Sequence, residues 1–138
     1  IDTTFTGSRA ELAENVRRGP TGIDTIVARH RAKGRTQPII VSEMGTCGEY
    51  GRHDPAGAQW TEEFEAEYVG DVLDTVFANP EICGMTIWQF TDAKTYTRIE
   101  GMRGRSYGVN TGGLYDLYRR PKLSVEPVRE LFHSNKAK

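Results

Sequence analysis

The sequence lacks several features that would mark a particular class of protein. It has only two cysteines, Cys47 and Cys83, and they stand too far apart to form a CxxC pair. This spacing gives neither a disulfide framework nor a zinc signature, so we expect two free thiols and favour a reducing cytoplasmic location. No run of about 18 apolar residues occurs, so we expect no membrane-spanning helix.

An excess of charge of one sign is also missing. Lys and Arg number 18 against 19 for Asp and Glu, which gives a formal net charge of -1. Such a balance creates no field that would recruit nucleic acid or an anionic membrane surface. A neutral or weakly charged small molecule is therefore the expected partner.

Cofactor and metal signatures are missing as well. No phosphate loop or dinucleotide fingerprint follows an expected strand. The acids of "EEFEAE" (62–67) are joined by no histidine at helical spacing, so we expect a solvated helix face and not a metal site. We predict that the chain needs neither a cofactor nor a metal.

The chain reads as one loop-rich segment. The first residues, "IDTTFTGSRAEL", show no targeting signal, and because residue 1 is not a methionine we expect an excerpt of a longer protein. The 15 glycines predict many turns. No repeat, low-complexity tract or linker divides residues 1–138, so we expect no internal domain boundary.

Apolar periodicity predicts alternating helices and strands. The expected elements are helices at 10–19, 22–34 and 60–80, strands at 38–43 and 82–92, and a turn with a final helix within 113–132. The order strand, helix, strand implies a parallel crossover and thus an α/β fold. Long irregular segments at 44–59 and 93–113 follow the strands, so both should lie at the sheet edge where α/β proteins bind ligands.

Two side chains at the strand ends could carry chemistry. The run Ile39-Ile40-Val41 is followed by Glu43 and then Gly45. A carboxylate at the exit of a buried strand is how barrel enzymes present a catalytic group, although an acid that caps a loop amide is the plainer alternative. Trp88 ends the next strand, where an aromatic ring can stack on a sugar or simply plug a barrel.

Four motifs make these hypotheses specific. They are "PIIVSEMG", "HDPAGAQWTEEFEAEY", "GMTIWQFTD" and "GVNTGGLYDLYRRPK". In this order and at nearly these spacings, they resemble the carboxyl-terminal part of the catalytic barrel of glycoside hydrolase family 2, and most of all β-glucuronidases and their β-galactosidase relatives. The resemblance covers roughly residues 38–132. It implies the C-terminal part of a (β/α)8 TIM barrel, incomplete because a closed barrel needs at least about 200 residues.

The resemblance also implies roles for the two side chains. Glu43 would be the nucleophile at the end of the seventh barrel strand, and Trp88 the sugar platform at the end of the eighth. A retaining glycosidase needs a second carboxyl about 5 to 5.5 Å from the nucleophile. In the family this acid/base glutamate follows an asparagine, and the chain contains no Asn-Glu pair. The isolated chain is therefore expected to be inactive.

The alternative function is not enzymatic. A truncated, inactive barrel piece could persist as a folded α/β module. Its open sheet edges would then need to pair, for example in a homodimer, because an unpaired edge invites aggregation.

The resemblance also gives partial information on which sugar the substrate contains. In β-glucuronidases the segment matching "VNTGG" carries an Asn-x-Lys that holds the sugar carboxylate; here Asn110 is present, but Gly112 replaces the lysine. Loss of that cation disfavours a uronic acid and favours a neutral β-glycoside such as a galactoside. Arg103 or Arg105 could supply the charge instead, which keeps a glucuronide open.

Two further residues have open roles. His53 either lines the substrate site or bonds to its neighbouring aspartate. Asp92 either orients a sugar hydroxyl or caps the loop. Cys47 lies four residues after Glu43, but no histidine stands at a triad position, so we expect no thiol chemistry.

Overall fold

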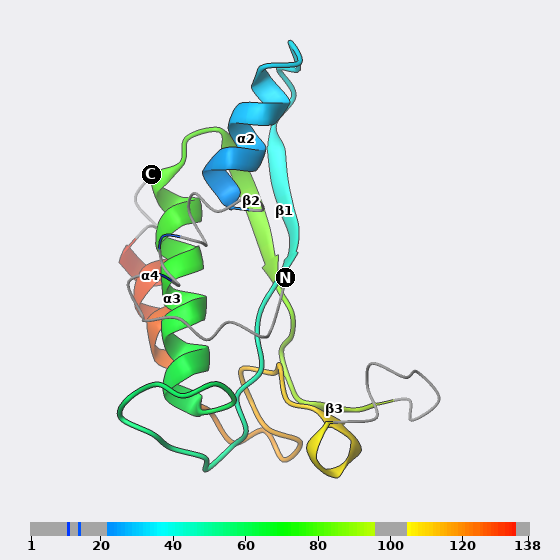
Figure 1. Cartoon of the computed structure of the whole chain (residues 1–138), viewed down its shortest axis with the longest axis vertical. Coiled ribbons are helices and arrows are strands. Elements are labelled where there is room, and N and C mark those ends of the chain that lie inside the picture. The colour runs from blue at the N-terminus through cyan, green and yellow to red at the C-terminus, as the bar shows by residue number, and fades with distance from the viewer. Residues whose placement is uncertain (1–10, 12–13, 15–21, 96–104, 135–138) are drawn as a thin grey trace.

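A computed structural model describes residues 11, 14, 22–95 and 105–134 (Figure 1). Its elements are α2 (Ile23–Arg31), β1 (Ile39–Met44), α3 (Glu62–Ala78), β2 (Ile82–Ile87), β3 (Ala93–Lys94), a short 3-10 helix (Ser106–Gly108), β4 (Val109–Asn110) and α4 (Val125–Ser134). The helix expected at 10–19 lies almost wholly outside the described residues, and so does Arg103.

The centre of the fold is a βαβ crossover. β1 and β2 pair in parallel, with Val41 opposite Met85 and Met44 opposite Ile87, and α3 connects them. The predicted parallel crossover and α/β class are thus confirmed. α3 lies along the strand pair (Figure 1), and α4 packs on α3 through an edge-to-face contact between Phe77 and Phe132. β3 and β4 form a separate antiparallel pair.

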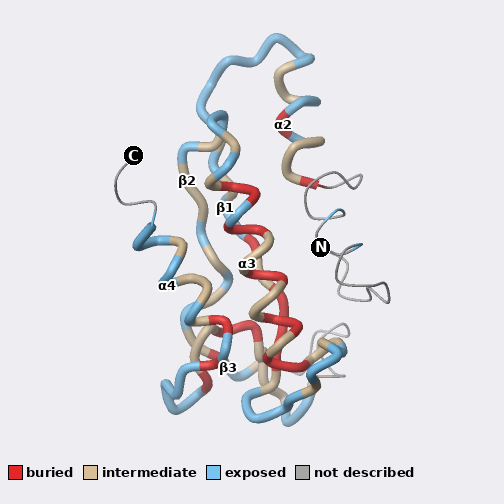
Figure 2. Tube along the Cα trace, turned by 90° about the vertical axis from the view of Figure 1, so that its left-hand side faces the viewer, coloured by how far each residue is buried: buried red, intermediate tan, exposed pale blue. Residues whose placement is uncertain are grey.

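The hydrophobic core lies between α3 and the strand pair β1 and β2. Its buried members are Met44, Phe64, Tyr68, Val69, Val72, Leu73 and Val76, and the buried residues run along α3 in Figure 2. Burial of each such side chain stabilises the fold by roughly 1.5–3 kcal/mol. Helix α3 begins where the sequence indicates, because the Thr61 hydroxyl accepts a hydrogen bond from the Phe64 N–H at 3.3 Å. It ends at Ala78, just before Asn79-Pro80.

The prediction of a solvated face at "EEFEAE" is wrong for two of its acids. Glu62 and Glu65 are only 4% and 1% exposed. Glu62 accepts hydrogen bonds from the backbone N–H of Gly51 at 2.6 Å and of Leu123 at 2.8 Å. The segment before α4 folds back over the first turn of α3 and encloses both carboxylates. The spacing of residues within the helix cannot predict this packing, because the contacts come from a segment far away in the sequence.

Outside the core, large apolar side chains remain exposed along the strands and directly after them. Ile40 is 63%, Trp88 49% and Phe90 63% exposed. Cys47 is buried and Cys83 exposed, and both are free thiols, as predicted. None of the helices in the described part of the chain is long and apolar enough to cross a bilayer.

Candidate active site

The structure brings Glu43 and Trp88 to the same end of the strand pair. Glu43 is the penultimate residue of β1, and Trp88 directly follows β2. The Trp88 N–H donates to the carbonyl oxygen of Met44 at 2.7 Å, which continues the parallel pairing past the strands. Both side chains are exposed. A carboxylate and an indole therefore stand on neighbouring strand ends, open to solvent.

Gly45 permits this close approach. A Cβ atom at this position would lie 2.0 Å from the carbonyl oxygen of Trp88, well inside van der Waals contact. Any other residue at this position would push the two strand ends apart. The backbone requirement thus explains why a glycine closely follows the carboxylate. The Trp88–Gln89 peptide bond is cis.

Asp92 lies inside the loops that follow the strands. It is 7% exposed and accepts a hydrogen bond from the Gly113 N–H at 3.0 Å and from the Lys122 ammonium at 2.8 Å. Burial raises the pKa of this carboxyl, and the Lys122 charge opposes that effect. In this structure Asp92 caps a loop amide.

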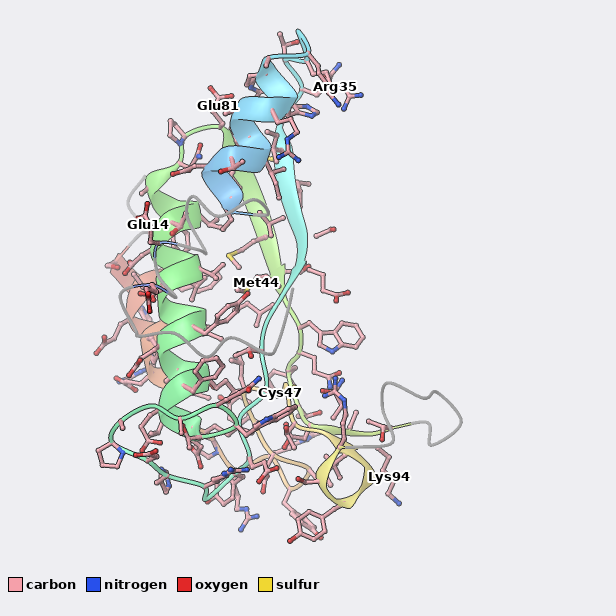
Figure 3. The ribbon with its side chains drawn as sticks, viewed as in Figure 1. Glu14, Arg35, Met44, Cys47, Glu81 and Lys94 are labelled. Atoms are coloured by element: carbon pink, nitrogen blue, oxygen red, sulfur yellow. The ribbon has the colours of Figure 1, made fainter. Side chains whose placement is uncertain are left out.

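Lys122 is the residue that sequence reasoning missed. Its side chain is fully buried, and its ammonium group donates to the carbonyl oxygens of Gly48 at 2.7 Å and Thr111 at 2.6 Å as well as to Asp92. One cation therefore joins the loop after β1, the loop after β2 and the segment before α4. In Figure 3 the chain enters this region from Met44 through Cys47. A lysine within the motif "YRRPK" was the only signal in the sequence.

Glu65 faces the same cation from α3. Its carboxylate lies 3.6 Å from the Lys122 ammonium and accepts a hydrogen bond from the Ser124 hydroxyl at 3.0 Å. Burial raises the pKa of Glu65 to about 8, against the attraction of Lys122. One buried cation thus lies between two buried carboxyl groups, those of Asp92 and Glu65.

Asn110 lies beside Arg105 and Cys47. The Arg105 guanidinium donates to the Asn110 side-chain oxygen at 2.9 Å and to the Cys47 sulfur at 3.1 Å. The same oxygen accepts the Gly112 N–H at 3.1 Å. A Cβ atom at Gly112 would lie 3.1 Å from the Thr46 carbonyl oxygen, so this backbone is closely packed where the family pattern has a lysine. The guanidinium is the positive charge beside Asn110.

His53 lies in the loop after β1, and its side chain is 52% exposed. Its Nδ1 atom lies 3.0 Å from a carboxylate oxygen of Glu63 in the first turn of α3. The hydrogen bond expected with the neighbouring aspartate is thus made with Glu63 instead. The backbone N–H of Asp54 donates to the same carboxylate at 3.1 Å, so both groups fix this loop to the helix.

Comparison with known proteins finds glycoside hydrolases among the relatives of this chain. No family model matches the chain. A β-glucuronidase from Streptococcus agalactiae serotype V is 30% identical over 95 residues, which make up 68% of this chain and 15% of that protein. A crystal structure of a GH2 β-galacturonidase from Eisenbergiella tayi bound to galacturonate matches with a TM-score of 0.75 and 31% identity over 81% of this chain. The resemblance to glycoside hydrolase family 2 is confirmed.

The chain matches only a part of the length of each relative. The chain spans 15% of the curated β-glucuronidase and 20% of the solved β-galacturonidase. A β-glucuronidase from Faecalibacterium prausnitzii, 22% identical, shares the fold over 96% of this chain with a TM-score of 0.72. The chain thus resembles one segment of these family 2 enzymes.

No metal centre accompanies this segment among the described residues. They contain no group of three or more His, Cys, Asp or Glu side chains that could hold a metal ion. The acids that cluster near α3 are engaged with Lys122, backbone amides and His53.

Proposed function

We propose that the chain is the carboxyl-terminal barrel segment of a retaining β-glycoside hydrolase of family 2, with Glu43 as the nucleophile. The observation that carries this proposal is the pairing of the strand ends. Met44 pairs with Ile87, so Glu43 and Trp88 stand at the same end of the strand pair, and both side chains are exposed. An aromatic face that stacks on the C–H side of a sugar ring would hold the anomeric carbon near that carboxylate.

The chemistry then follows the double-displacement route. Ionised Glu43 attacks the anomeric carbon, and the leaving group departs with a proton from a second carboxyl. The glycosyl ester on Glu43 is later hydrolysed by water. Because the sequence contains no Asn-Glu pair, we place the acid/base outside these 138 residues, on another part of the barrel. The isolated chain should bind sugar without turning it over.

We further infer that the substrate is a β-uronide. Gly112 alone favours a neutral sugar, but the relatives are named for glucuronides and galacturonides, and one was solved with galacturonate bound. Arg105 supports this substrate class, because its guanidinium lies 2.9 Å from the Asn110 side-chain oxygen. A guanidinium can pair with a carboxylate through two parallel hydrogen bonds. In this proposal Arg105 replaces the lysine of the family pattern.

The test is sugar binding by the chain, measured by NMR titration with galacturonate, glucuronate and galactose. We expect millimolar affinity for a uronate and at least about tenfold weaker binding of galactose, because galactose lacks the charge that Arg105 pairs with. Arg105→Ala and Trp88→Ala should each weaken uronate binding, whereas Arg35→Ala, an exposed arginine near α2, should not. Equal affinity for galactose and galacturonate would contradict the uronide assignment.

A further inference from the structure

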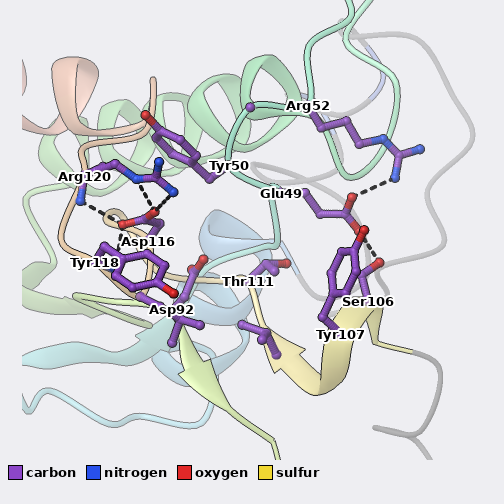
Figure 4. A pocket seen from close by; sticks show the side chains of 13 residues that line it. Glu49, Tyr50, Arg52, Asp92, Ser106, Tyr107, Thr111, Asp116, Tyr118 and Arg120 are labelled. Atoms are coloured by element: carbon purple, nitrogen blue, oxygen red, sulfur yellow. Dashed lines mark hydrogen bonds and ion pairs between the residues drawn. The ribbon is translucent and has the colours of Figure 1, made fainter.

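A groove of about 610 Å³ lies on the loops beyond the strand ends (Figure 4). Its walls come from residues 49–52 after β1, residues 106–111 around the 3-10 helix and β4, and residues 116–120 before α4. Its described lining does not include Glu43, Trp88 or Arg105. The groove adjoins the site proposed for the uronide, because Ser106 follows Arg105 and Val109 and Thr111 flank Asn110.

The rim of the groove carries three tyrosines with accessible rings. Tyr107 is 99%, Tyr118 81% and Tyr50 41% exposed. Large aromatic rings usually lie against other apolar groups, and flat rings left open to solvent offer a surface for stacking. On a sugar, the matching surface is the C–H face of the pyranose ring.

The polar walls are held in place before any ligand binds. Arg120 donates to the Asp116 carboxylate at 2.7 Å through Nε and at 2.6 Å through Nη2, and its guanidinium lies 4.1 Å from the centre of the Tyr50 ring. Across the groove, Glu49 accepts hydrogen bonds from Arg52 and from the Ser106 hydroxyl. Figure 4 shows these two pairs on opposite sides. Fixed walls lower the ordering cost of binding.

Charges of both signs line the groove and nearly balance. The charged side chains of its described lining are Glu49, Asp92, Asp116, Arg52 and Arg120. Lys122 does not line the groove but offsets the charge of Asp92 from beneath, at 2.8 Å. A phosphate or a uronate would find no net attraction here, whereas carboxylate and hydroxyl oxygens suit a neutral ligand rich in hydroxyl groups.

We propose that this groove binds a neutral saccharide unit, a second sugar of a larger glycoside. This rests on the proposed function, because it takes the ligand to be a glycoside. A purely aromatic ligand would also stack on the tyrosines, but it would desolvate the carboxylates and hydroxyls of the walls without giving them partners.

NMR titration of the chain with cellotriose and xylotriose tests the proposal. We expect the backbone amide signals of Tyr107 and Tyr118 to shift as either trisaccharide is added. Tyr118→Ala should weaken binding about fivefold or more because it removes a stacking face, and Tyr118→Phe should keep the affinity within about twofold. Because Tyr118 is exposed, neither variant should change the melting temperature.

The two proposals fail in different ways. Trp88→Ala should leave trisaccharide binding unchanged, and Tyr118→Ala should leave galacturonate binding unchanged. Failure of uronate binding alone overturns the uronide assignment and not the groove. The groove proposal is overturned if neither trisaccharide shifts the tyrosine signals, or if Tyr118→Ala binds them as well as the unaltered chain does. It is also overturned if 4-nitrophenol, an aromatic probe without sugar hydroxyls, shifts the same signals and displaces the trisaccharides.

Discussion

The core around α3 and the loops at the carboxyl end of the strands are held together by different forces. Between the strands and α3, apolar side chains such as Leu73 and Val72 are almost completely buried. At the loop end, the buried side chains include charged groups, with Lys122 between Asp92 and Glu65. Apolar packing tolerates many sequences, whereas a buried ion cluster demands all of its members. The loop end is therefore more easily disrupted by a single substitution than the apolar core.

The largest effect should come from the buried cation. Lys122→Met leaves two buried carboxyls and two carbonyl oxygens without their partner, so we expect a loss of about 3–5 kcal/mol in the free energy of unfolding. Urea denaturation measures this loss. Lys94→Met, at an exposed lysine, is the matched control and should change stability little. A loss in Lys122→Met no greater than in the control would show that the cluster does not hold the loops.

The core should respond to a cavity. Leu73 is 0% exposed, and Leu73→Ala should cost roughly 2–5 kcal/mol through lost burial and the space left behind. Leu117→Ala, at a leucine that is 44% exposed, should cost less than about 0.5 kcal/mol. The same denaturation series compares both variants. Equal losses would mean that the apolar contacts of α3 do not determine stability.

Proton uptake should distinguish the two regions further. Folding raises the pKa of Glu65 from 4.5 to about 8, so the folded state binds more protons than the unfolded state within that window. Stability should therefore fall as pH rises through it, at up to about 1.4 kcal/mol per pH unit from this group. In Glu65→Gln this contribution to the slope should vanish. Identical pH slopes in the two proteins would refute the assignment.

A smaller effect is expected where the two regions meet. Gly45→Ala puts a methyl group against the Trp88 carbonyl oxygen and should cost about 1–3 kcal/mol as the strand ends separate. Gly84→Ala, in the same sheet, has nothing within 4 Å of the new methyl group and serves as the control. Thermal unfolding compares the two. A Gly45→Ala variant as stable as Gly84→Ala would exclude the close approach seen here.

The core was predictable from the sequence because its signals are local. The i, i+4 spacing of Phe64, Tyr68 and Val72 indicates which face of α3 is buried, and Thr61 indicates where the helix begins. The strand expected at 82–92 ends at Ile87 in the structure, since the chain then leaves β1 and enters the loops. Boundaries depend on pairing partners, which local alternation does not reveal.

The candidate site was predictable in part. Parallel strands bring their carboxyl ends to one edge, so the proximity of Glu43 and Trp88 follows from the crossover alone. The burial of Glu65, the position of Lys122 and the contact between Arg105 and Asn110 join segments far apart in the sequence. Such contacts arise from tertiary packing, and no period or spacing in the sequence records them.

The central claim is that Glu43 is the nucleophile, and covalent trapping tests it most directly. In a 2-deoxy-2-fluoro-β-galacturonosyl fluoride the departing fluoride needs no proton, so the missing acid/base is not required. The carboxylate would form a glycosyl ester that the 2-fluorine makes slow to hydrolyse. Intact mass spectrometry and peptide mapping should find one adduct on Glu43 and none in Glu43→Gln. An adduct on another carboxyl, or equal labelling of Glu43→Gln, would contradict the account.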